Sequence, residues 1–405
     1  MGSKDRNVKW IVISGDGMAD FPCEELGHKT PLEVANHPNL DEMARRSIIG
    51  LIKTIPLGFD PGSDVAHMAL LGFDPRRYYT GRGPLEAVSL GVNLTESEIA
   101  ARCNLVTIRD GLLRDHSGGG VTDREAEELL SVLPPLKDVE IKRSSGHRSV
   151  IILKGGYTTL VKCFAPQDYI GWPVRMILPR PLSDMADKTV RLLRKIIMDS
   201  LEALGTHPVN LKRVEEGRGE ANALWPWGLG RRPRLPSFSE FNGLQGAIIS
   251  DMDVIRGIGL CAGMKAVKVP DADHGAKVRR VTEAIEEGHN FVLVHVEAPD
   301  EAGHAGDAEL KIKAIEELDE KLIGRLLDRF EGEDVLLSLV IDHYTPVKLR
   351  KHVAGLMPFL VMRKEPRRER DFKTFSEKTA FEFRELTLQA EHFIRLLIEV
   401  GDRSS

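Results

Sequence analysis

Apolar stretches of strand length alternate with helical patterns at both ends of this chain. Residues 8–14 and 48–55 are short apolar runs, and residues 38–46 between them have helical spacing. The C-terminal part continues with apolar runs at 290–296, 334–341 and 358–362 and helical patterns at 278–287 and 309–330. Continuous apolar strands that alternate with helices predict an α/β domain whose mainly parallel sheet is covered on both faces.

The middle of the chain has a different pattern. Short strand-like runs, such as 101–108 and 149–153, are separated by helical stretches. Residues 217–238 are rich in Gly, Pro, Trp and Arg, which is typical of a linker or a cleft-lining segment. We therefore predict a smaller α+β domain inserted into the α/β domain. The predicted boundaries are 1–85 and 236–405 for the α/β domain and 86–235 for the insertion, with a solvated charge run at 363–370.

Composition excludes some classes of function and leaves others open. A net charge of -5 over 405 residues argues against a general nucleic-acid binder. It leaves anionic substrates open, since a metal ion or a local Arg cluster can supply positive charge. The four cysteines lie far apart and predict reduced thiols rather than disulfides or a zinc ribbon. No apolar stretch reaches the roughly 18 residues of a membrane span, so we expect a cytoplasmic protein without membrane partners.

Four groups of polar residues follow predicted strands or lie in the loops just after them. They are Asp16 in SGDG, Ser63 with Asp64 and His67 in PGSDVAH, Asp300 and His304 in APDEAGHAGD, and Asp342 and His343 in IDHYTP with His352 beyond. Ligands of open α/β sheets bind beyond the carboxyl ends of the strands, so these groups can converge. Each residue alone also has a structural explanation, such as a turn for Asp16 or a helix N-cap for Ser63. Their combination favours a metal site, because carboxylate and imidazole suit manganese or zinc.

The same residues suit phosphoryl transfer. A serine hydroxyl is a weak nucleophile that metal coordination activates. Two metal ions about 3.5–4 Å apart can stabilise the attacking and leaving oxygens of an in-line displacement. A helix that begins at Ser63 would also direct free N–H groups toward a phosphate. The sequence therefore predicts a two-metal phosphoryl-transfer enzyme with Ser63 as its nucleophile.

Three longer segments carry a family resemblance. They are HKTPLEVANHPNLDEMA at 28–44, PGSDVAHMALLGFDPRRYYTGRGPLEA at 61–87 and HPVNLKRVEEGRGEANALWPWGLGRRPRLPSF at 207–238. With the metal motifs, they make the chain resemble the archaeal-type, 2,3-bisphosphoglycerate-independent phosphoglycerate mutases of the alkaline phosphatase superfamily. The resemblance implies an alkaline-phosphatase-like three-layer α/β/α domain with an inserted transferase-like substrate domain. It also implies interconversion of 3-phosphoglycerate and 2-phosphoglycerate through a phosphoserine, in glycolysis and gluconeogenesis.

The resemblance also implies roles for individual residues. Ser63 would be phosphorylated, and no bisphosphoglycerate or other organic cofactor would be needed. One metal would be held by Asp16, Ser63, Asp342 and His343, and the other by Asp300, His304 and His352. Manganese is the expected ion, with magnesium, cobalt or zinc as alternatives. His116 in RDHSGGG and Arg148 in GHRSVII match positions that contact substrate, as a proton relay and a bidentate anion ligand. A surface histidine and a surface salt bridge are the alternative readings, and the oligomeric state stays open between monomer and homo-oligomer.

Four segments depart from the family pattern. Tyr344 replaces a usual Ser, residues 353–356 replace Ser-Gly-Asp-Pro, residues 269–277 replace a Gly-Ala-Thr-Gly loop, and residues 166–180 are unusual. None of them removes a predicted ligand. They leave two alternatives, a related phosphotransferase or phosphomonoesterase near the proposed homoserine-kinase branch, and a non-catalytic family member. The chain has no Walker-type phosphate loop, which counts against an ATP-using kinase. The intact set of predicted ligands counts against a non-catalytic protein.

Overall fold

The computed structural model describes residues 8–363 and 372–402, so all but the first residue of the predicted charge run lies outside the described residues. The chain divides into two compact units. The main unit comprises residues 1–79 and 234–405, and the inserted unit comprises residues 80–233. The inserted unit thus starts before helix α5 (Arg82–Ser89), which the expected boundary at residue 85 would have cut.

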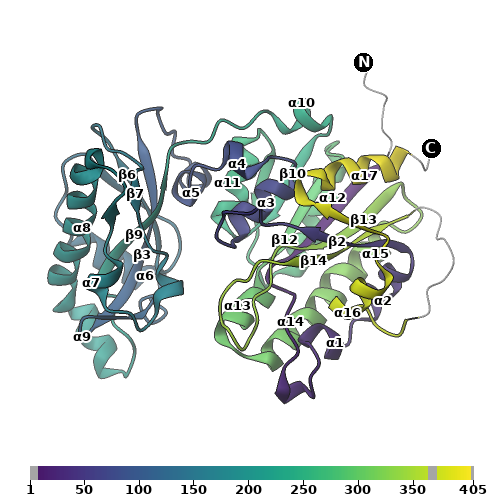
Figure 1. The fold of residues 1–405 in the computed structure, drawn as a ribbon, viewed down its shortest axis with the longest axis horizontal. Coiled ribbons are helices and arrows are strands. Elements are labelled where there is room, and N and C mark those ends of the chain that lie inside the picture. Colours follow the sequence, from purple (N-terminus) through teal and green to yellow (C-terminus); the bar gives the residue numbers. More distant parts are fainter. Residues whose placement is uncertain (1–7, 364–371, 403–405) are drawn as a thin grey trace. The chain divides into compact units, whose positions relative to one another are not determined.

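The main unit is built on an eight-stranded sheet with the order β11-β10-β12-β1-β13-β14-β2-β15 (Figure 1). Its strands are β1 (Lys9–Gly15), β2 (Ser47–Lys53), β10 (Gly246–Ser250), β11 (Lys265–Lys268), β12 (Phe291–Val296), β13 (Val335–Ile341), β14 (Leu356–Met362) and β15 (Leu386–Gln389). Only β14 runs opposite to the others, pairing antiparallel with β13 and β2. The mainly parallel sheet predicted from the apolar runs is therefore confirmed.

Helices cover both faces of this sheet, which makes three layers (Figure 1). One face carries α3 (Ser63–Leu70), α11 (Asp253–Cys261) and α17 (Phe393–Asp402). The other carries α1 (Pro31–Val34), α2 (Pro38–Arg45), α12 (His274–Glu286), α14 (Ala308–Leu318) and α16 (Glu377–Phe383). The buried Trp10 fixes the last helix, because its indole N–H donates to Leu397 O at 3.1 Å.

The helix predicted at 309–330 is interrupted in its middle. After α14 the chain forms a π-helical segment, Asp319–Gly324, and then α15 (Arg325–Arg329). Asp319 accepts hydrogen bonds from Leu40 N at 2.6 Å and from Asn39 Nδ2 at 2.8 Å, which satisfies donors at the start of α2. A π-helical segment has a wider turn than an α-helix, and here it connects α14 to α15.

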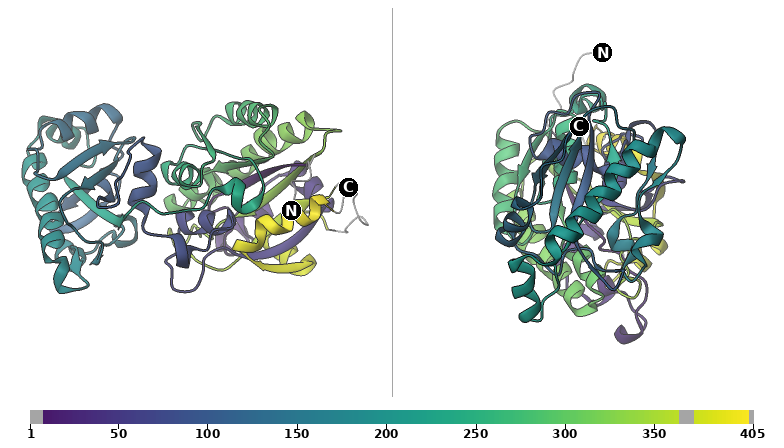
Figure 2. Two further views of the ribbon diagram at one scale, coloured as in Figure 1. Left: turned by 90° about the horizontal axis from the view of Figure 1, so that it is seen from above. Right: turned by 90° about the vertical axis from the view of Figure 1, so that its left-hand side faces the viewer.

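The inserted unit has a five-stranded sheet with antiparallel pairing and helices, as predicted for an α+β domain. Its strands are β3 (Ile99–Arg109), β4 (Leu112–Asp115), β5 (Val139–Arg143), β6 (Arg148–Leu153) and β9 (Ala223–Gly230), with a separate pair β7 (Val161–Lys162) and β8 (Arg180–Pro181). Its further helices are α6 (Asp123–Ser131), α7 (Val174–Ile177), α8 (Asp187–Gly205) and α9 (Pro208–Glu215). The long helix α8 packs on β9 and lies along the sheet (Figure 2).

Of the two readings of 217–238, linker or cleft-lining segment, the linker is wrong for the central part. Residues 223–230 form β9, which pairs with β3, and Trp225 is buried. The Pro and Gly residues of this strand hide its pattern in the sequence.

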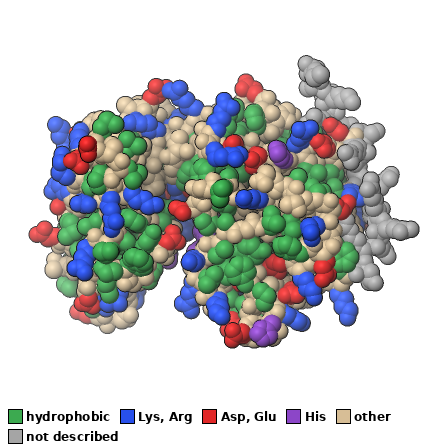
Figure 3. Space-filling view, in the orientation of Figure 1, with side chains coloured by type: hydrophobic (Ala, Val, Ile, Leu, Met, Phe, Trp, Pro, Cys, Tyr) green, Lys and Arg blue, Asp and Glu red, His purple; other side chains and the backbone are tan. Residues whose placement is uncertain are grey.

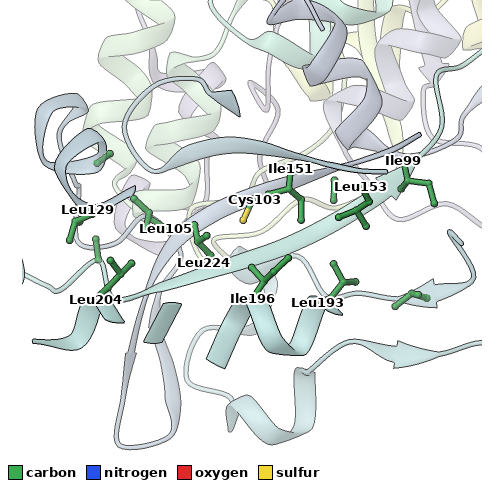
Figure 4. Packing of buried hydrophobic residues seen from close by; sticks show 14 of the residues in the cluster. Ile99, Cys103, Leu105, Leu129, Ile151, Leu153, Leu193, Ile196, Leu204 and Leu224 are labelled. Atoms are coloured by element: carbon green, nitrogen blue, oxygen red, sulfur yellow. The ribbon is translucent and has the colours of Figure 1, made fainter. Parts of the chain in front are cut away.

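The core of the inserted unit is formed by β3, β6, β9 and α8. Leu105, Ile151 and Leu224 of the sheet face Leu193 and Ile196 of α8 (Figure 4). On the surface seen in Figure 3, hydrophobic side chains of this unit emerge between Lys and Arg side chains. Among the described helices of the protein, none combines the length and the hydropathy needed to cross a bilayer.

Candidate active site

Three neighbouring strands of the main sheet end at the same level. Gly15 at the end of β1 pairs with Val296 of β12 on one side and with Ile341 of β13 on the other. The residues that follow these three strands therefore meet at one edge of the sheet. They are Asp16 after β1, Asp300 and His304 in α13 (Ala298–Ala305) after β12, and Asp342 and His343 after β13.

Ser63 reaches this edge from a different strand. Strand β2 ends at Lys53, and the following loop leads to Ser63, the first residue of α3. Ser63 Oγ lies 3.1 Å from Asp16 Oδ2 and 3.3 Å from His343 Nε2, in a buried position. The nucleophile predicted from the sequence thus lies beside two predicted metal ligands.

One group of donor atoms is formed by Asp16, Asp342 and His343, whose ligand atoms lie within 4.8 Å of one another. Asp342 Oδ1 accepts hydrogen bonds from Gly17 N at 3.0 Å and His343 N at 2.8 Å. Asp342 Oδ2 is buried and has no hydrogen-bond partner among the described residues. A buried carboxylate oxygen without a donor is costly, and a bound cation would satisfy it.

A second group is formed by Asp300, His343 and His352, again with ligand atoms within 4.8 Å, and His304 adjoins it. The Nδ1 atoms of His304 and His352 lie 3.0 and 3.3 Å from Arg350 O and Pro61 O. A carbonyl oxygen only accepts, so both Nδ1 atoms carry protons. When both rings are neutral, their Nε2 lone pairs then face each other across 2.8 Å. A cation between them removes this repulsion, so the residues fit a metal ion.

The charges of the site lead to the same conclusion. Burial, and then Asp342 and Asp300, raise the pKa of Asp16 well above its ordinary value. Burial alone would lower the pKa of His352, but the adjacent Asp300 raises it to about 9, so this position favours positive charge at the ring. Burial lowers the pKa of His343 to about 4, which keeps this ring neutral and able to bind a metal. Five of the seven predicted ligands form these two groups, which share His343, and Ser63 and His304 adjoin them through Asp16 and His352.

Two side chains that the sequence did not single out hydrogen-bond to the predicted ligands. Thr345 Oγ1 donates to Asp300 Oδ1 and lies 3.2 Å from His343 Nδ1. His295, inside β12, places Nε2 3.0 Å from Asp16 Oδ2, and burial lowers its pKa to about 3. The only signal for His295 was a polar residue within an otherwise apolar run.

His67, for which the sequence allows packing or helix capping as well as function, contacts the backbone of the predicted nucleophile Ser63. His67 Nδ1 donates to Ser63 O at 2.7 Å, and His67 Nε2 lies 2.8 Å from Ser14 Oγ. Burial lowers the pKa of His67, so the ring is neutral. The neutral ring accepts from the Ser14 hydroxyl and ties the first turn of α3 to β1.

Two of the departures from the family pattern contact each other. Tyr344 and Val353 form a short antiparallel bridge, with N–H···O distances of 3.1 and 2.9 Å, and the Tyr344 hydroxyl donates to Leu356 O. This bridge closes the loop between His343 and His352, whose rings stack with centroids 4.0 Å apart. The unusual residues therefore position two predicted ligands and do not replace them.

The unusual loop at 269–277 supports α13 in a similar way. Asp271 accepts hydrogen bonds from Glu297 N at 3.0 Å and Ala298 N at 2.9 Å, at the start of that helix. The buried Lys277 donates to Asp271 Oδ1 at 2.6 Å. This buried pair fixes the helix that carries Asp300 and His304.

The two remaining candidates, His116 and Arg148, lie in the inserted unit. Arg148 begins β6, and the ring of His116 packs against His147 with centroids 5.9 Å apart. Burial lowers the pKa of His147 well below its ordinary value, and the charges of Arg102, Arg148 and His116 lower it further. This cluster of basic groups suits an anion.

A second set of charges in the inserted unit surrounds the buried Glu86. Burial would raise the pKa of Glu86, but Arg102, Arg82 and Arg148 lower it. Arg102 and Arg148 lower the pKa of both Glu86 and His147, so these two arginines lie between the two groups.

Comparison with known proteins gives consistent matches. Residues 44–210 match the family model of 2,3-bisphosphoglycerate-independent phosphoglycerate mutase. The mutase 2 of this name from Methanothermobacter thermautotrophicus is 41% identical over 362 residues, covering 87% of this chain and 88% of its own. The enzyme of the same name from Methanosarcina mazei is 37% identical over 403 residues, covering 97% of this chain and 100% of its own.

Solved structures share the architecture. The PH0037 protein of Pyrococcus horikoshii is 26% identical, with a TM-score of 0.76 and 98% of each chain covered. The cofactor-independent phosphoglycerate mutase of Thermoplasma acidophilum is 25% identical, with a TM-score of 0.58, covering 97% of this chain and 100% of its own. Together with the sequence relatives, these matches show that the chain belongs to the 2,3-bisphosphoglycerate-independent phosphoglycerate mutase family.

Proposed function

We propose that this protein interconverts 3-phosphoglycerate and 2-phosphoglycerate through a phosphoserine at Ser63. The observation that carries the proposal is the position of Ser63 Oγ, within 3.3 Å of both Asp16 and His343 in a buried cluster of carboxylates and imidazoles. Family membership and the names of relatives at 37–42% identity support the same reaction. The substrate is a small molecule, and the reaction belongs to glycolysis and gluconeogenesis in the cytoplasm.

The donor set fits two divalent ions, manganese before magnesium, cobalt or zinc, because it mixes carboxylates with imidazoles. Asp16, Ser63, Asp342 and His343 would hold one ion, and Asp300, His304 and His352 the other. Such ions would lower the pKa of the Ser63 hydroxyl and stabilise negative charge on the transferring phosphoryl group.

The proposed reaction consists of two phosphoryl transfers, one to Ser63 and one from it. Ser63 Oγ loses its proton and forms a bond to phosphorus, while the bond between phosphorus and the C3 oxygen of glycerate breaks and that oxygen gains a proton. The 2-hydroxyl of glycerate then loses its proton and attacks the phosphoserine, and Ser63 Oγ regains a proton. The first N–H groups of α3 would hold the phosphoryl oxygens, since a helix N-terminus favours anions.

Residues of the inserted unit are proposed to bind the glycerate. Arg148 offers a planar pair of donors for a carboxylate or phosphate. His116 would carry protons to and from the glycerate hydroxyls. The basic side chains around His147, among them Arg102 and Arg148, support an anionic substrate.

The test follows 2-phosphoglycerate formed from 3-phosphoglycerate with manganese and without bisphosphoglycerate. We expect conversion by the wild type, none with EDTA, and none by Ser63→Ala. Ser239→Ala, at a half-buried serine of α10 (Phe238–Asn242), is the matched control and should keep full activity. A metal-loaded protein that incorporates phosphate at Ser63 but forms no 2-phosphoglycerate would contradict the proposed substrate.

A further inference from the structure

We propose that His295 is a positioning residue that orients the Asp16 carboxylate for a divalent metal ion. The inference rests on the proposed function, because it assigns Asp16 to the metal. His295 is not one of the proposed metal ligands, and it is fully buried inside the apolar strand β12. An imidazole in such a position needs hydrogen-bond partners for both nitrogens, since an unpaired buried polar group is costly.

The hydrogen-bond partners of His295 determine which of its two ring nitrogens carries the proton. Ser250 Oγ accepts from Met252 N at 3.0 Å, so its own hydrogen is free to point toward His295 Nδ1 at 3.2 Å. In a neutral imidazole one nitrogen accepts and the other donates. Because Nδ1 accepts from Ser250, the proton resides on Nε2, which donates to Asp16 Oδ2 at 3.0 Å.

This contact holds Asp16 Oδ2, which Ser63 Oγ also approaches at 3.1 Å, and leaves Asp16 Oδ1 directed at the neighbouring side chains. Asp16 Oδ1 lies 3.3 Å from His343 Nε2, within the group of donor atoms that Asp342 completes. A donor on Oδ2 sets the plane of the carboxylate and favours its ionised form, which is the form that binds a metal. Histidine here supports a carboxylate ligand, the reverse of the more usual pairing.

Neighbouring strands hold the imidazole itself. Ser14 of β1 lies opposite His295 in the parallel register, and Ser14 Oγ is bonded to His67 Nε2 at 2.8 Å. The ring of His67 packs edge-on against His295, with centroids 5.1 Å apart and an angle of 70°. The donor at Nε2 is therefore held in place before any metal binds.

The experiment measures manganese affinity by competition with a fluorescent chelator, separately from mutase activity. We expect His295→Leu, which removes the donor and keeps an apolar side chain, to weaken binding about 10- to 100-fold. His295→Gln can place an amide N–H near the Nε2 position and should restore most of the affinity. His37→Leu is the matched control, because His37 is a buried histidine bonded to Leu32 O and Asp41, away from the site, and should leave affinity unchanged.

The outcomes separate this inference from the proposed function. Absence of manganese binding by the wild type would contradict the proposed function. Wild-type binding with unchanged affinity in a folded His295→Leu variant would overturn the inference, as would equal losses in His295→Leu and His295→Gln. If His295→Leu does not fold, Ser250→Ala decides, because it removes the hydroxyl that fixes the tautomer. We then expect weaker binding in Ser250→Ala, and unchanged affinity would overturn the inference.

Discussion

At the scale of single residues, one hydroxyl joins the two groups of candidate metal ligands. Thr345 Oγ1 donates its only hydrogen to Asp300 and accepts from His343 Nδ1. His343 Nε2 is thereby left unprotonated and directed at the ligands. We expect Thr345→Val to lower manganese affinity about tenfold or more, and Thr345→Ser to stay near the wild type. Isothermal titration of the metal-free protein measures both.

Thr379→Val provides the control for this prediction. Thr379 is also buried and also donates, to Thr374 O at 2.8 Å, but it lies in α16 rather than in the site. Equal losses of affinity in the Thr345 and Thr379 variants would show a general effect of the lost hydroxyl on the fold, and would contradict a specific role for Thr345.

The residues that a sequence reveals in such a site are those that end its strands. Asp16 and Asp342 could be predicted because each follows directly on an apolar run. His295 could not, because it stands within such a run and resembles a core residue. Thr345 could not either, since its importance depends on which side chains meet it after folding.

At the scale of elements, a buried ion pair ties the loops of the site to two helices. Lys311 of α14 donates to Asp20 Oδ2 at 2.8 Å and to Thr345 O at 2.9 Å. Glu377 of α16 accepts from Asp20 N at 2.9 Å and from Thr30 Oγ1 at 2.7 Å. Both loops that follow the central strands β1 and β13 are thereby anchored.

Glu377 makes this anchor sensitive to pH. Burial raises its pKa from 4.5 to about 7, although Thr30, Asp20 N–H and Lys311 act in the other direction. Between these values the unfolded chain has lost the proton that the folded protein retains, so the free energy of unfolding falls as pH rises. The fall should reach at most about 3 kcal/mol and be complete above pH 7. Urea denaturation of wild type and Glu377→Gln from pH 5 to pH 8, in EDTA, measures it.

The Glu377→Gln variant should lack this part of the pH dependence, because an amide does not titrate. Other groups contribute equally to both proteins, so the difference between the two curves isolates Glu377. Parallel curves across this range would contradict the prediction.

The same scale shows where periodicity fails to predict an element. The pattern at 309–330 predicts one helix, and its apolar spacing continues through the π-helical segment at Asp319–Gly324. At this segment Asp319 binds the start of α2, a distant part of the sequence, and the apolar spacing gives no sign of that contact. Strand β9 was missed for the opposite reason, since its Pro, Gly and Trp residues resemble a loop until it pairs with β3.

At the scale of the whole molecule, the order of the strands could not be predicted from the sequence. The alternation of strands and helices predicts a three-layer α/β fold with an insertion. It does not reveal that β12, β1 and β13 are neighbours, although these strands come from both ends of the chain. That adjacency brings Asp16, Asp300 and Asp342 together. These three carboxylates could therefore be proposed from the sequence, while their meeting depends on long-range strand pairing.

The division into two units predicts that substrate binding and metal binding can be separated by mutation. Arg148 lies in the inserted unit, where it shares the neighbourhood of Glu86 with other arginines. A lost charge-assisted hydrogen bond costs about 1.5–3 kcal/mol, so we expect Arg148→Met to lower kcat/KM for 3-phosphoglycerate about 10- to 100-fold. Manganese affinity should not change, whereas Asp342→Asn should lose it.

The control variant Arg124→Met tests whether replacing an arginine elsewhere in the inserted unit also lowers kcat/KM. Arg124 is exposed and pairs only with Glu128 among the described residues, so its variant should keep wild-type kcat/KM. Steady-state kinetics at saturating manganese, combined with metal titration, distinguishes the cases. Reduced manganese affinity in Arg148→Met would contradict the separation, because Arg148 and the predicted metal ligands belong to different units.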